Sequence, residues 1–499
     1  MTTAGARKES WGVGGAPAEA AVGDEPVSPT GQYFNSSVLS VCILGGFEFD
    51  VPIDDSPTMD VLKNLFLPIN PRFSSIMVRD EHGVQQWKRV EVKLEDHVKI
   101  PVFPSGLTVD SYDELTQAYL TNIAMEQLPQ HRPLWELHII KYPTRTGEGT
   151  LVFKLHHALG DGFSLMGALF ACLRRADDHS LPLTFPATSR GRAEAGGKAA
   201  SLWRRAARAV WVGINTVQGF GWSLLKSNLM EDDRSPIRSG EPGVEFQPVA
   251  ISFATFSLDD IRRVKAKLGG VSPTAMLSIA WLSFSSSVND VITGIICYGI
   301  QLYVQNASKR RNAAAPNMTA LVLLNTRAIN SYRTPAEMAR PGAESPWGNQ
   351  FGFLHVSLPK HEDLENTNPL DFVFEARETI KRKRSSLAVY LNGKLLETLR
   401  RLKGPEVTAK YIHSTLSNTS MTISNLIGPL EQMHIANHPI RSFYFMVVGV
   451  PQSLTITMVS YMGKLKVAFG TEKDFIDGQL LVACMEKAFT RILQEALRK

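Results

Sequence analysis

Cysteine is scarce in this sequence, and the few cysteines stand far apart. The four are Cys42, Cys172, Cys297 and Cys484. No two of them have the short spacing of a disulfide framework or a cysteine zinc site, so we expect neither to organise the fold. The sequence is therefore typical of a protein from a reducing compartment.

An excess of charge of one sign is also lacking. Lys and Arg number 53 and Asp and Glu number 48, which leaves a formal net charge of +5. This modest balance does not indicate a nucleic-acid partner. It is compatible with a phosphate-bearing co-substrate or an anionic lipid surface.

The first 30 residues lack the continuous apolar run of a secretory signal, and we interpret 1–30 as a flexible leader. The remaining chain is longer than one hydrophobic core usually serves, so we expect two lobes. A charged stretch with Pro and Gly at 231–248 is the candidate linker. It would separate an N-terminal lobe over 31–230 from a C-terminal lobe over 249–499.

The coarse pattern alternates between strand-like and helix-like segments, which predicts an α/β fold. Strands are expected at 37–44, 135–141, 149–157, 319–325, 351–358, 443–449, 454–461 and 464–469. Helices are expected at 57–67, 111–126, 163–175, 258–268, 370–384, 390–402 and 474–498.

Long apolar runs are rare, and one needs separate treatment. Residues 271–304 carry a single charge, Asp290, and are long enough to cross a bilayer. However, several serines and an Asn-Asp pair between 283 and 290 would then lie at the bilayer centre, at a cost of several kcal/mol. Two buried helical segments joined by a polar turn are the favoured interpretation.

Residues 201–228 form an amphipathic pattern. On a helix, one face carries apolar residues and the other gathers arginines; the apolar set is Trp203, Ala207, Val210, Trp211, Ile214 and Val217, and the basic set is Arg204, Arg205 and Arg208. Such a helix suits a lipid interface. It equally suits a surface helix that covers the protein's own core, and the sequence leaves both interpretations open.

The stretch "LHHALGDG" at 155–162 carries the strongest chemical signal. The apolar run before it predicts a strand, in which His156 and His157 point to opposite faces and cannot share a metal; no third ligand lies nearby, so no metal site is expected. The turn at 160–162 then opens a helix, placing His157 at a strand end, where a neutral imidazole can accept a proton. Asp161 would cap that helix or pair with an arginine.

"HHALGDG" resembles the HHxxxDG motif of the acyl-CoA-dependent acyltransferase superfamily. "PLWELHII" at 133–140 and the pair Asn289-Asp290 look like elements of its wax ester synthase/diacylglycerol acyltransferase branch. Three further blocks are similar to C-terminal blocks of plant members: 323–327, 347–359 and 424–429. The resemblance covers about residues 30–499. One departure is 271–287, which reads as an insertion before the Asn-Asp pair and puts activity in doubt.

This resemblance implies a fold and a set of roles. The fold would be the two-lobed chloramphenicol acetyltransferase-like one, with mixed sheets and an active-site channel between the lobes. His157 would be the general base and His156 a supporting residue. Asp161, followed by Gly162, would be structural, with Arg327 as its partner. Asn425 would donate a hydrogen bond to the oxyanion.

The resemblance also implies the substrates. Long-chain acyl-CoA would be the co-substrate, with no permanently bound cofactor, and a fatty alcohol the acceptor, giving a wax ester. A diacylglycerol acceptor, giving triacylglycerol, and a non-catalytic lipid-binding protein are the alternatives. The run "KRKRSS" at 381–386 could meet CoA phosphates or remain solvated. We expect the cytosolic face of the endoplasmic reticulum membrane, or also the plasma membrane, as the location, with 201–228 as the membrane contact.

Overall fold

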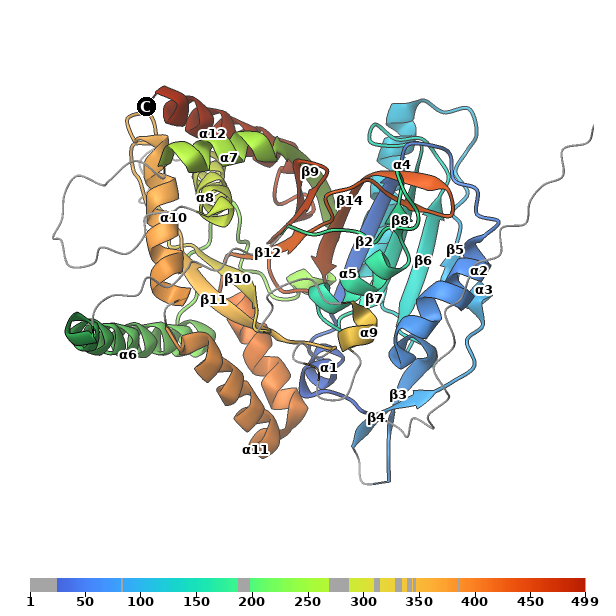
Figure 1. Cartoon of the computed structure of the whole chain (residues 1–499), viewed down its shortest axis with the longest axis horizontal. Coiled ribbons are helices and arrows are strands. Elements are labelled where there is room, and N and C mark those ends of the chain that lie inside the picture. The colour runs from blue at the N-terminus through green and yellow to red at the C-terminus, as the bar shows by residue number, and fades with distance from the viewer. Residues whose placement is uncertain are drawn as a thin grey trace, which may run out of the picture.

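The computed structural model describes residues 25–498, apart from 82–83, 187–197, 269–286, 309–314, 328–333, 339–342, 344–346 and 385. These residues form two α/β lobes that lie side by side, as Figure 1 shows. The predicted α/β class, with two lobes and mixed sheets, is therefore confirmed. Most of the predicted leader lies outside the described residues.

The N-terminal lobe is built on a seven-stranded sheet with the order β5-β6-β7-β2-β14-β13-β8. Its strands are β5 (Val98–Lys99), β6 (Trp135–Ile140), β7 (Gly149–His156), β2 (Cys42–Phe49), β14 (His438–Val448), β13 (Met433–Ile435) and β8 (Arg174–Arg175). Because β13 and β14 come from the last quarter of the chain, the C-terminal half completes the N-terminal sheet. A small sheet of β1 (Glu25–Pro26), β4 (Gln85–Arg89) and β3 (Ser75–Arg79) lies beside it.

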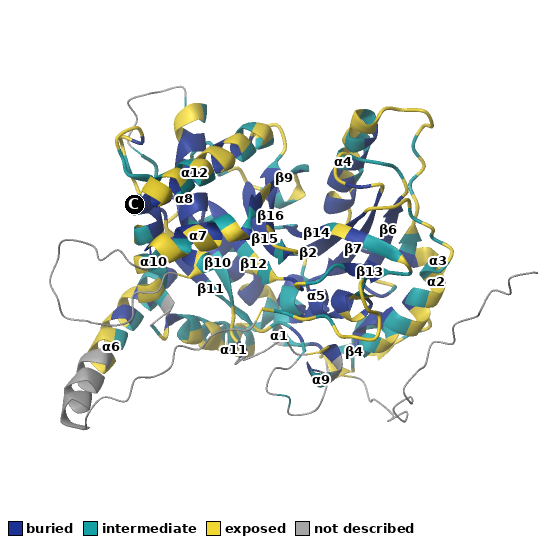
Figure 2. Ribbon diagram, turned by 45° about the horizontal axis from the view of Figure 1, so that its top comes forward, coloured by how far each residue is buried: buried dark blue, intermediate teal, exposed yellow. Residues whose placement is uncertain are grey.

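The C-terminal lobe has a six-stranded sheet with the order β11-β10-β12-β15-β16-β9. Its strands are β11 (Phe351–Ser357), β10 (Thr319–Asn325), β12 (Met421–Ile427), β15 (Leu454–Tyr461), β16 (Lys464–Glu472) and β9 (Val249–Ser257). Four helices pack with one face of this sheet in a common core: α7 (Leu258–Leu268), α8 (Val288–Ala307), α10 (Pro369–Arg384) and α12 (Gly478–Arg498). In Figure 2 the central strands of the N-terminal sheet are largely dark, whereas β10, β11 and β12 mix buried and intermediate residues and the outer helices carry exposed faces.

The remaining helices surround the two sheets. They are α1 (Pro29–Phe34), α2 (Thr58–Val61), α3 (Leu94–His97), α4 (Val109–Met125), α5 (Gly162–Ala171), α6 (Lys198–Asn228), α9 (Pro335–Met338) and α11 (Ala388–Ser417). A π-helical turn, Leu62–Phe66, continues α2, and single 3-10 turns occupy Leu67–Ile69, Pro71–Ser74 and Val244–Phe246. Helix α11 is kinked because Gly404 has a φ of 84° and Pro405 follows it.

Strand β2 starts and ends later than the sequence predicted. A strand was expected at 37–44, ending just before the Gly45-Gly46 pair. The strand instead runs through both glycines to Phe49. A Cβ atom at Gly46 would lie only 2.3 Å from Cζ of Tyr444, so the missing side chain makes room for that ring in the neighbouring strand.

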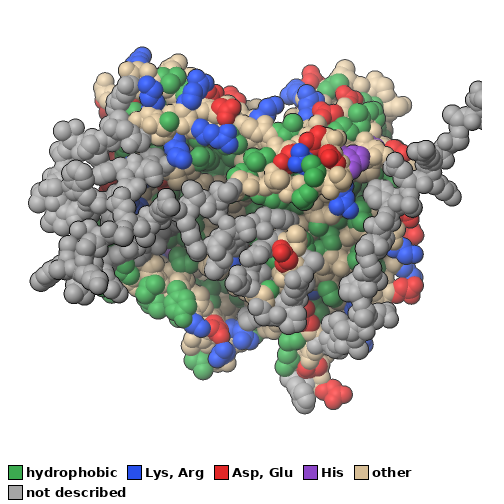
Figure 3. Space-filling model, in the orientation of Figure 1, with side chains coloured by type: hydrophobic (Ala, Val, Ile, Leu, Met, Phe, Trp, Pro, Cys, Tyr) green, Lys and Arg blue, Asp and Glu red, His purple; other side chains and the backbone are tan. Residues whose placement is uncertain are grey.

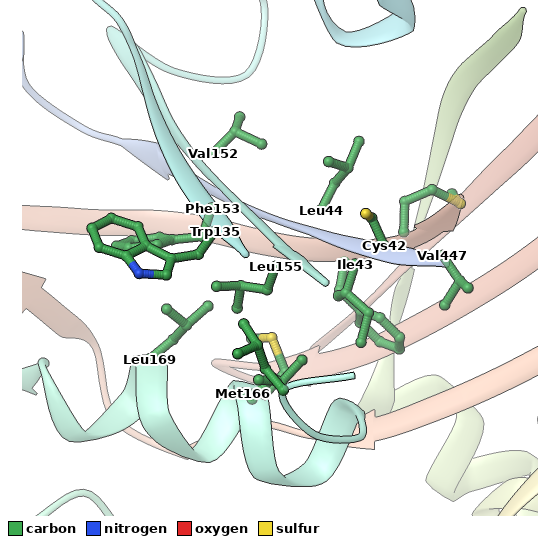
Figure 4. Packing of buried hydrophobic residues seen from close by; sticks show 14 of the residues in the cluster. Cys42, Ile43, Leu44, Trp135, Val152, Phe153, Leu155, Met166, Leu169 and Val447 are labelled. Carbon is green, nitrogen blue, oxygen red and sulfur yellow. The ribbon is translucent and has the colours of Figure 1, made fainter. Parts of the chain in front are cut away.

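Helix α5 fixes the core beneath the HHxxxDG motif. Its residues Met166 and Leu169 reach toward Ile43 and Leu155 of the central strands, as Figure 4 shows. All four side chains are at most 1% exposed. Burying apolar side chains of this size stabilises the fold by about 1.5–3 kcal/mol each, so the strand-turn-helix unit is firmly held.

The described part of the apolar run 271–304 is a buried helix of the C-terminal lobe. Ser287 caps α8, and the Asp290 carboxylate accepts a hydrogen bond from the Ser287 N–H over 2.7 Å, which completes a capping box. Residues 271–286, the bulk of the predicted insertion and of the first helical segment, lie outside the described residues. No described helix has the length and apolarity that crossing a membrane requires.

The predicted linker at 231–248 is pinned to the C-terminal sheet by a buried carboxylate. Asp232 is 2% exposed and accepts hydrogen bonds from both the N–H and hydroxyl groups of Thr319 and Ser420. Lys226 Nζ lies 2.5 Å from Asp232 Oδ1. This segment therefore joins α6 to the first residues of β10 and the approach to β12.

Candidate active site

The HHxxxDG motif lies between the end of β7 and the start of α5, as the sequence predicted. Asp161 is the N-cap of α5, and its Oδ1 accepts a hydrogen bond from the Ser164 N–H over 2.9 Å. Strand β7 has already ended at His156, and the cap opens the helix at Gly162. A Cβ atom at Gly162 would meet only Leu426 Cδ1 at 3.8 Å, so this glycine faces the C-terminal lobe.

His157 lies where the lobes meet. Its ring centroid is 4.5 Å from that of Phe34 on α1 and 5.5 Å from that of Phe351 on β11. The residue is 5% exposed, and burial lowers the pKa of its imidazole, although Asp161 opposes that effect. The imidazole is therefore neutral near pH 7, as a general base must be.

The two ring nitrogens of His157 differ. Nδ1 is buried and has no hydrogen-bond partner among the described residues. Nε2 also lacks a protein partner within that part of the chain, but it is not sealed from solvent. Nε2 is therefore the ring nitrogen that is available to a further hydrogen-bond partner.

His156 points elsewhere and is fully buried. Its Nδ1 accepts a hydrogen bond from the Ala158 N–H over 3.1 Å, so the proton must be on Nε2, which lies 3.3 Å from the Ser40 hydroxyl. Burial lowers its pKa to about 3. These contacts fix the turn that carries His157.

The predicted pairing of Asp161 with Arg327 is present in the structure. Arg327 Nη1 lies 2.6 Å from Asp161 Oδ2, and Nη2 lies 3.1 Å from Oδ1, so the guanidinium binds the carboxylate with two parallel hydrogen bonds. Nη2 also donates to the Gly348 carbonyl over 2.6 Å and to the Ser164 hydroxyl over 2.9 Å. This buried pair joins the catalytic turn to the C-terminal lobe.

A second contact between the lobes runs along residues 347–350. Trp347 Nε1 donates to the Leu159 carbonyl over 2.9 Å, and the Gln350 N–H donates to Asp161 Oδ2 over 2.9 Å. Gly348 between them has a φ of 113°, which L side chains rarely adopt. The sequence flagged this block only as a family resemblance. The sequence signal that could have identified this contact is a glycine within a polar segment.

Asn349, in the same block, contacts His157 directly. Its Nδ2 donates to the His157 carbonyl over 2.9 Å, while its Oδ1 is buried without a partner among the described residues. The amide lies close enough to raise the pKa of the imidazole against the larger effect of burial. The sequence analysis assigned no role to Asn349, because nothing local shows that it lies beside residue 157.

The oxyanion role of Asn425 stays a prediction, and the structure does not place this side chain beside His157. Neighbouring residues of a strand point to opposite faces, and Leu426 of β12 faces Gly162. Asn425 therefore points to the helix-covered face, where its Nδ2 donates to Asn289 Oδ1 over 3.0 Å at the start of α8. The two family elements meet there, on the far side of the sheet from Leu426.

The basic run at 381–386 ends α10. Lys381 and Arg382 are exposed, whereas Lys383 is partly buried, and burial lowers its pKa to about 8. The structure does not place this run against the catalytic turn. A CoA-phosphate role for it stays a prediction.

The predicted channel between the lobes also stays a prediction. One cavity of about 230 Å³ is lined by Arg441, Lys464 and Lys466 among others. A second, of about 30 Å³, lies between β2, β7 and the turn before α2. His157 lines neither.

The comparisons with known proteins agree with this geometry. The wax ester synthase/diacylglycerol acyltransferase catalytic domain matches residues 66–275, and the WS/DGAT C-terminal domain matches residues 347–493. Wax ester synthase/diacylglycerol acyltransferase 4 of Arabidopsis thaliana is 28% identical over 466 residues, covering 89% of this chain and 85% of the relative. Number 3 of the same plant is 27% identical, covering 95% and 94%.

Solved structures support the fold. The wax ester synthase/diacylglycerol acyltransferase from Marinobacter aquaeolei VT8 superposes with a TM-score of 0.55 at 14% identity, covering 94% of this chain and 99% of that one. The first condensation domain of the CDA synthetase gives a TM-score of 0.50 at 13% identity, covering 94% and 92%. Taken with the two domain matches, these findings show that the chain belongs to the wax ester synthase/diacylglycerol acyltransferase family.

Proposed function

We propose that this protein transfers a long-chain acyl group from acyl-CoA to the hydroxyl of a fatty alcohol, forming a wax ester. The observation that carries the proposal is His157: a buried, neutral imidazole at the meeting of two lobes, with Nε2 open and no protein partner within the described part of the chain. A ring nitrogen without a protein partner at the junction of the lobes is available to accept a proton from a substrate hydroxyl.

In the proposed reaction, His157 Nε2 takes the proton from the alcohol hydroxyl as its oxygen attacks the thioester carbonyl. The tetrahedral oxyanion then collapses, the C–S bond breaks, and the CoA thiolate takes the proton from the imidazolium. The products are the ester and free CoA, and no acyl-enzyme forms. A positioned base of this kind contributes about 10²–10⁴-fold, and alignment of the two substrates contributes further.

The surrounding contacts orient that base. The Asp161–Arg327 pair holds the turn against the C-terminal lobe, and Asn349 holds the main chain of His157 itself. Because Arg327 and Asn349 belong to one lobe and His157 to the other, the catalytic geometry depends on how the lobes are joined. Asp161 and Arg327 are therefore proposed as positioning residues.

The choice of substrates follows the family and energetics. Each buried methylene contributes about 0.8 kcal/mol, so long apolar chains can supply much of the binding free energy. Both relatives described above are named for wax ester synthesis and for diacylglycerol acylation. Diacylglycerol is therefore the second candidate acceptor at the same site. We propose the cytosolic face of the endoplasmic reticulum as the location, which fractionation of a tagged chain tests.

A competition assay tests the proposal. Purified protein receives radiolabelled palmitoyl-CoA with equal amounts of hexadecanol and a diacylglycerol, and the products are separated. Excess hexadecyl palmitate supports the wax ester synthase, and excess triacylglycerol favours the second acceptor. Acyl-CoA binding without any ester product would identify a non-catalytic lipid-binding protein and overturn the proposal.

A further inference from the structure

An exposed apolar face on helix α6 continues onto the start of α11. On α6, Val210, Trp211, Ile214 and Val217 follow the spacing of one helical face, and each side chain is 50% to 74% exposed. On α11, Leu387 and Tyr390 are 57% and 62% exposed. We call these six residues the α6–α11 patch.

The two helices form one surface at this point. The Leu387 N–H donates to the Thr216 hydroxyl over 2.9 Å, and a Cβ atom at Gly219 would lie 3.2 Å from that of Ala388. The first turn of α11 therefore sits against the middle of α6. Figure 3 shows apolar side chains gathered at the lower left, where Figure 1 places the meeting of α6 and α11.

The charged residues of the two segments that carry the patch are all basic. Neither 198–228 nor 381–394 contains a single Asp or Glu. Lys381 and Arg382 at the end of α10 are exposed, and Lys394 Nζ lies 5.9 Å from the centroid of the Tyr390 ring. Lys394 also pairs with Glu397 over 3.3 Å, so the patch is an apolar and aromatic surface with a mainly basic rim.

We infer that the α6–α11 patch docks this protein onto the surface of an anionic lipid bilayer. Trp and Tyr lie favourably at headgroup depth, aliphatic side chains enter the acyl boundary, and each nearby Lys or Arg adds attraction to anionic headgroups. A second copy fits the patch less well, because a two-fold contact would oppose two basic rims with no acid in either segment.

The patch lies next to β11, the strand that carries Phe351 beside His157. Val389, between Leu387 and Tyr390, packs onto Gly352, where a Cβ atom would lie 2.4 Å from Val389 Cγ1. Gly352 directly follows Phe351, whose ring packs against His157. Docking through this patch brings the lobe junction near the membrane, where water-insoluble acceptors reside.

Vesicle flotation tests the inference without any acyl-transfer assay. The full chain is floated with phosphatidylcholine vesicles, with and without phosphatidylserine, at low and high salt. We expect the protein to bind the vesicles that contain phosphatidylserine, and we expect the bound fraction to fall as the salt concentration rises. Trp211→Ser with Ile214→Ser, and separately Leu387→Ser with Tyr390→Ser, should each lower the bound fraction about tenfold or more, since large apolar area no longer enters the bilayer.

Matched controls separate docking from general loss of surface apolarity. Val84→Ser with Val102→Ser removes exposed apolar side chains from the N-terminal lobe and should leave flotation unchanged. Lys381→Glu with Lys394→Glu should weaken binding to the anionic vesicles only. All variants must keep the wild-type circular dichroism spectrum and melting midpoint.

Two results would overturn the inference. One is unchanged flotation of both patch variants, or an equal loss in the Val84/Val102 control. The other is a wild-type dimer, seen by analytical ultracentrifugation, that the patch variants convert to a monomer while vesicle binding persists, which would assign the patch to a second copy.

Discussion

Asn349 holds His157 from the opposite lobe: its Nδ2 donates to the His157 carbonyl over 2.9 Å. The other amide atom, Oδ1, and His157 Nδ1 are both buried and without partners among the described residues. Asn349 therefore fixes the main chain of His157 and raises the pKa of its imidazole, against the larger lowering by burial.

Replacing Asn349 by Leu should lower kcat with little change in KM, and should move the acidic limb of the pH–rate profile to lower pH. The reason is that the amide raises the pKa of His157, so its loss lets burial lower that pKa further. Asn349→Asp should move the limb the opposite way. Asn425→Leu is the matched control, since Asn425 faces the other side of its sheet, and it should leave the profile unchanged. A limb unmoved by Asn349→Leu would contradict the role.

Breaking the Asp161–Arg327 pair should destabilise the fold strongly. Asp161→Asn or Arg327→Met alone leaves a buried charge without its partner, which costs about 3–5 kcal/mol. The double replacement should recover much of that loss, so a double-mutant cycle measured by urea unfolding should show strong coupling. Additive effects of the two single changes would rule out the pair as a joint between lobes.

Asp232 and Lys226 provide a second buried pair, remote from His157. Asp232→Asn should lower the free energy of unfolding by about 3–5 kcal/mol, because Lys226 loses its ion-pair partner and the donors around Asp232 lose a charged acceptor. At temperatures where the variant is folded, kcat should remain near the wild-type value. A large loss of kcat in folded protein would show that 231–248 acts on catalysis.

Buried histidines should make the fold sensitive to acid. Burial lowers the pKa of His156 to about 3 and that of His355 to about 4, from 6.5 in the unfolded chain. As the pH falls, the unfolded state therefore binds protons at a higher pH than the folded state does. The contribution of these two histidines to stability is complete above about pH 6.5 and is lost as the pH falls toward 3. Each histidine contributes a slope of about 1.4 kcal/mol per pH unit in its window. His355→Gln should flatten the curve above pH 4 by one such slope, measured by denaturant unfolding. An unchanged slope would contradict the account.

The sequence predicted regular segments best where periodicity and turn signals agreed. Strands at 319–325 and 454–461 and the helix at 258–268 match β10, β15 and α7 to the residue. In α7, acidic residues begin the helix, lysines end it, and the buried residues recur every three or four positions. Such information is local.

Errors arose where tertiary contacts override local preference. Strand β2 runs through two glycines because Tyr444 needs the space at Gly46. Strands β9 and β12 were not predicted. Without β12 the direction of the Asn425 side chain could not be predicted, whereas the pleat of that strand turns it away from Leu426.

In the candidate site, too, local features were predicted and a long-range contact was missed. His157, Asp161 and the helix cap lie within one short stretch and were predicted from it, and the pairing with Arg327 followed from the family resemblance. Asn349 was missed because its contact with His157 spans 192 residues and joins two lobes. A hydrogen bond of that range leaves no local periodicity in one sequence.

Replacement of His157 by Ala tests the central claim most directly. The measurements are single-turnover ester formation from palmitoyl-CoA and hexadecanol, and calorimetric binding of palmitoyl-CoA, with His179→Ala, an exposed histidine, as control. The account predicts that His157→Ala slows ester formation by about 10²–10⁴-fold, while acyl-CoA binding and the control stay near wild type. Ester formation at the wild-type rate in His157→Ala would contradict it.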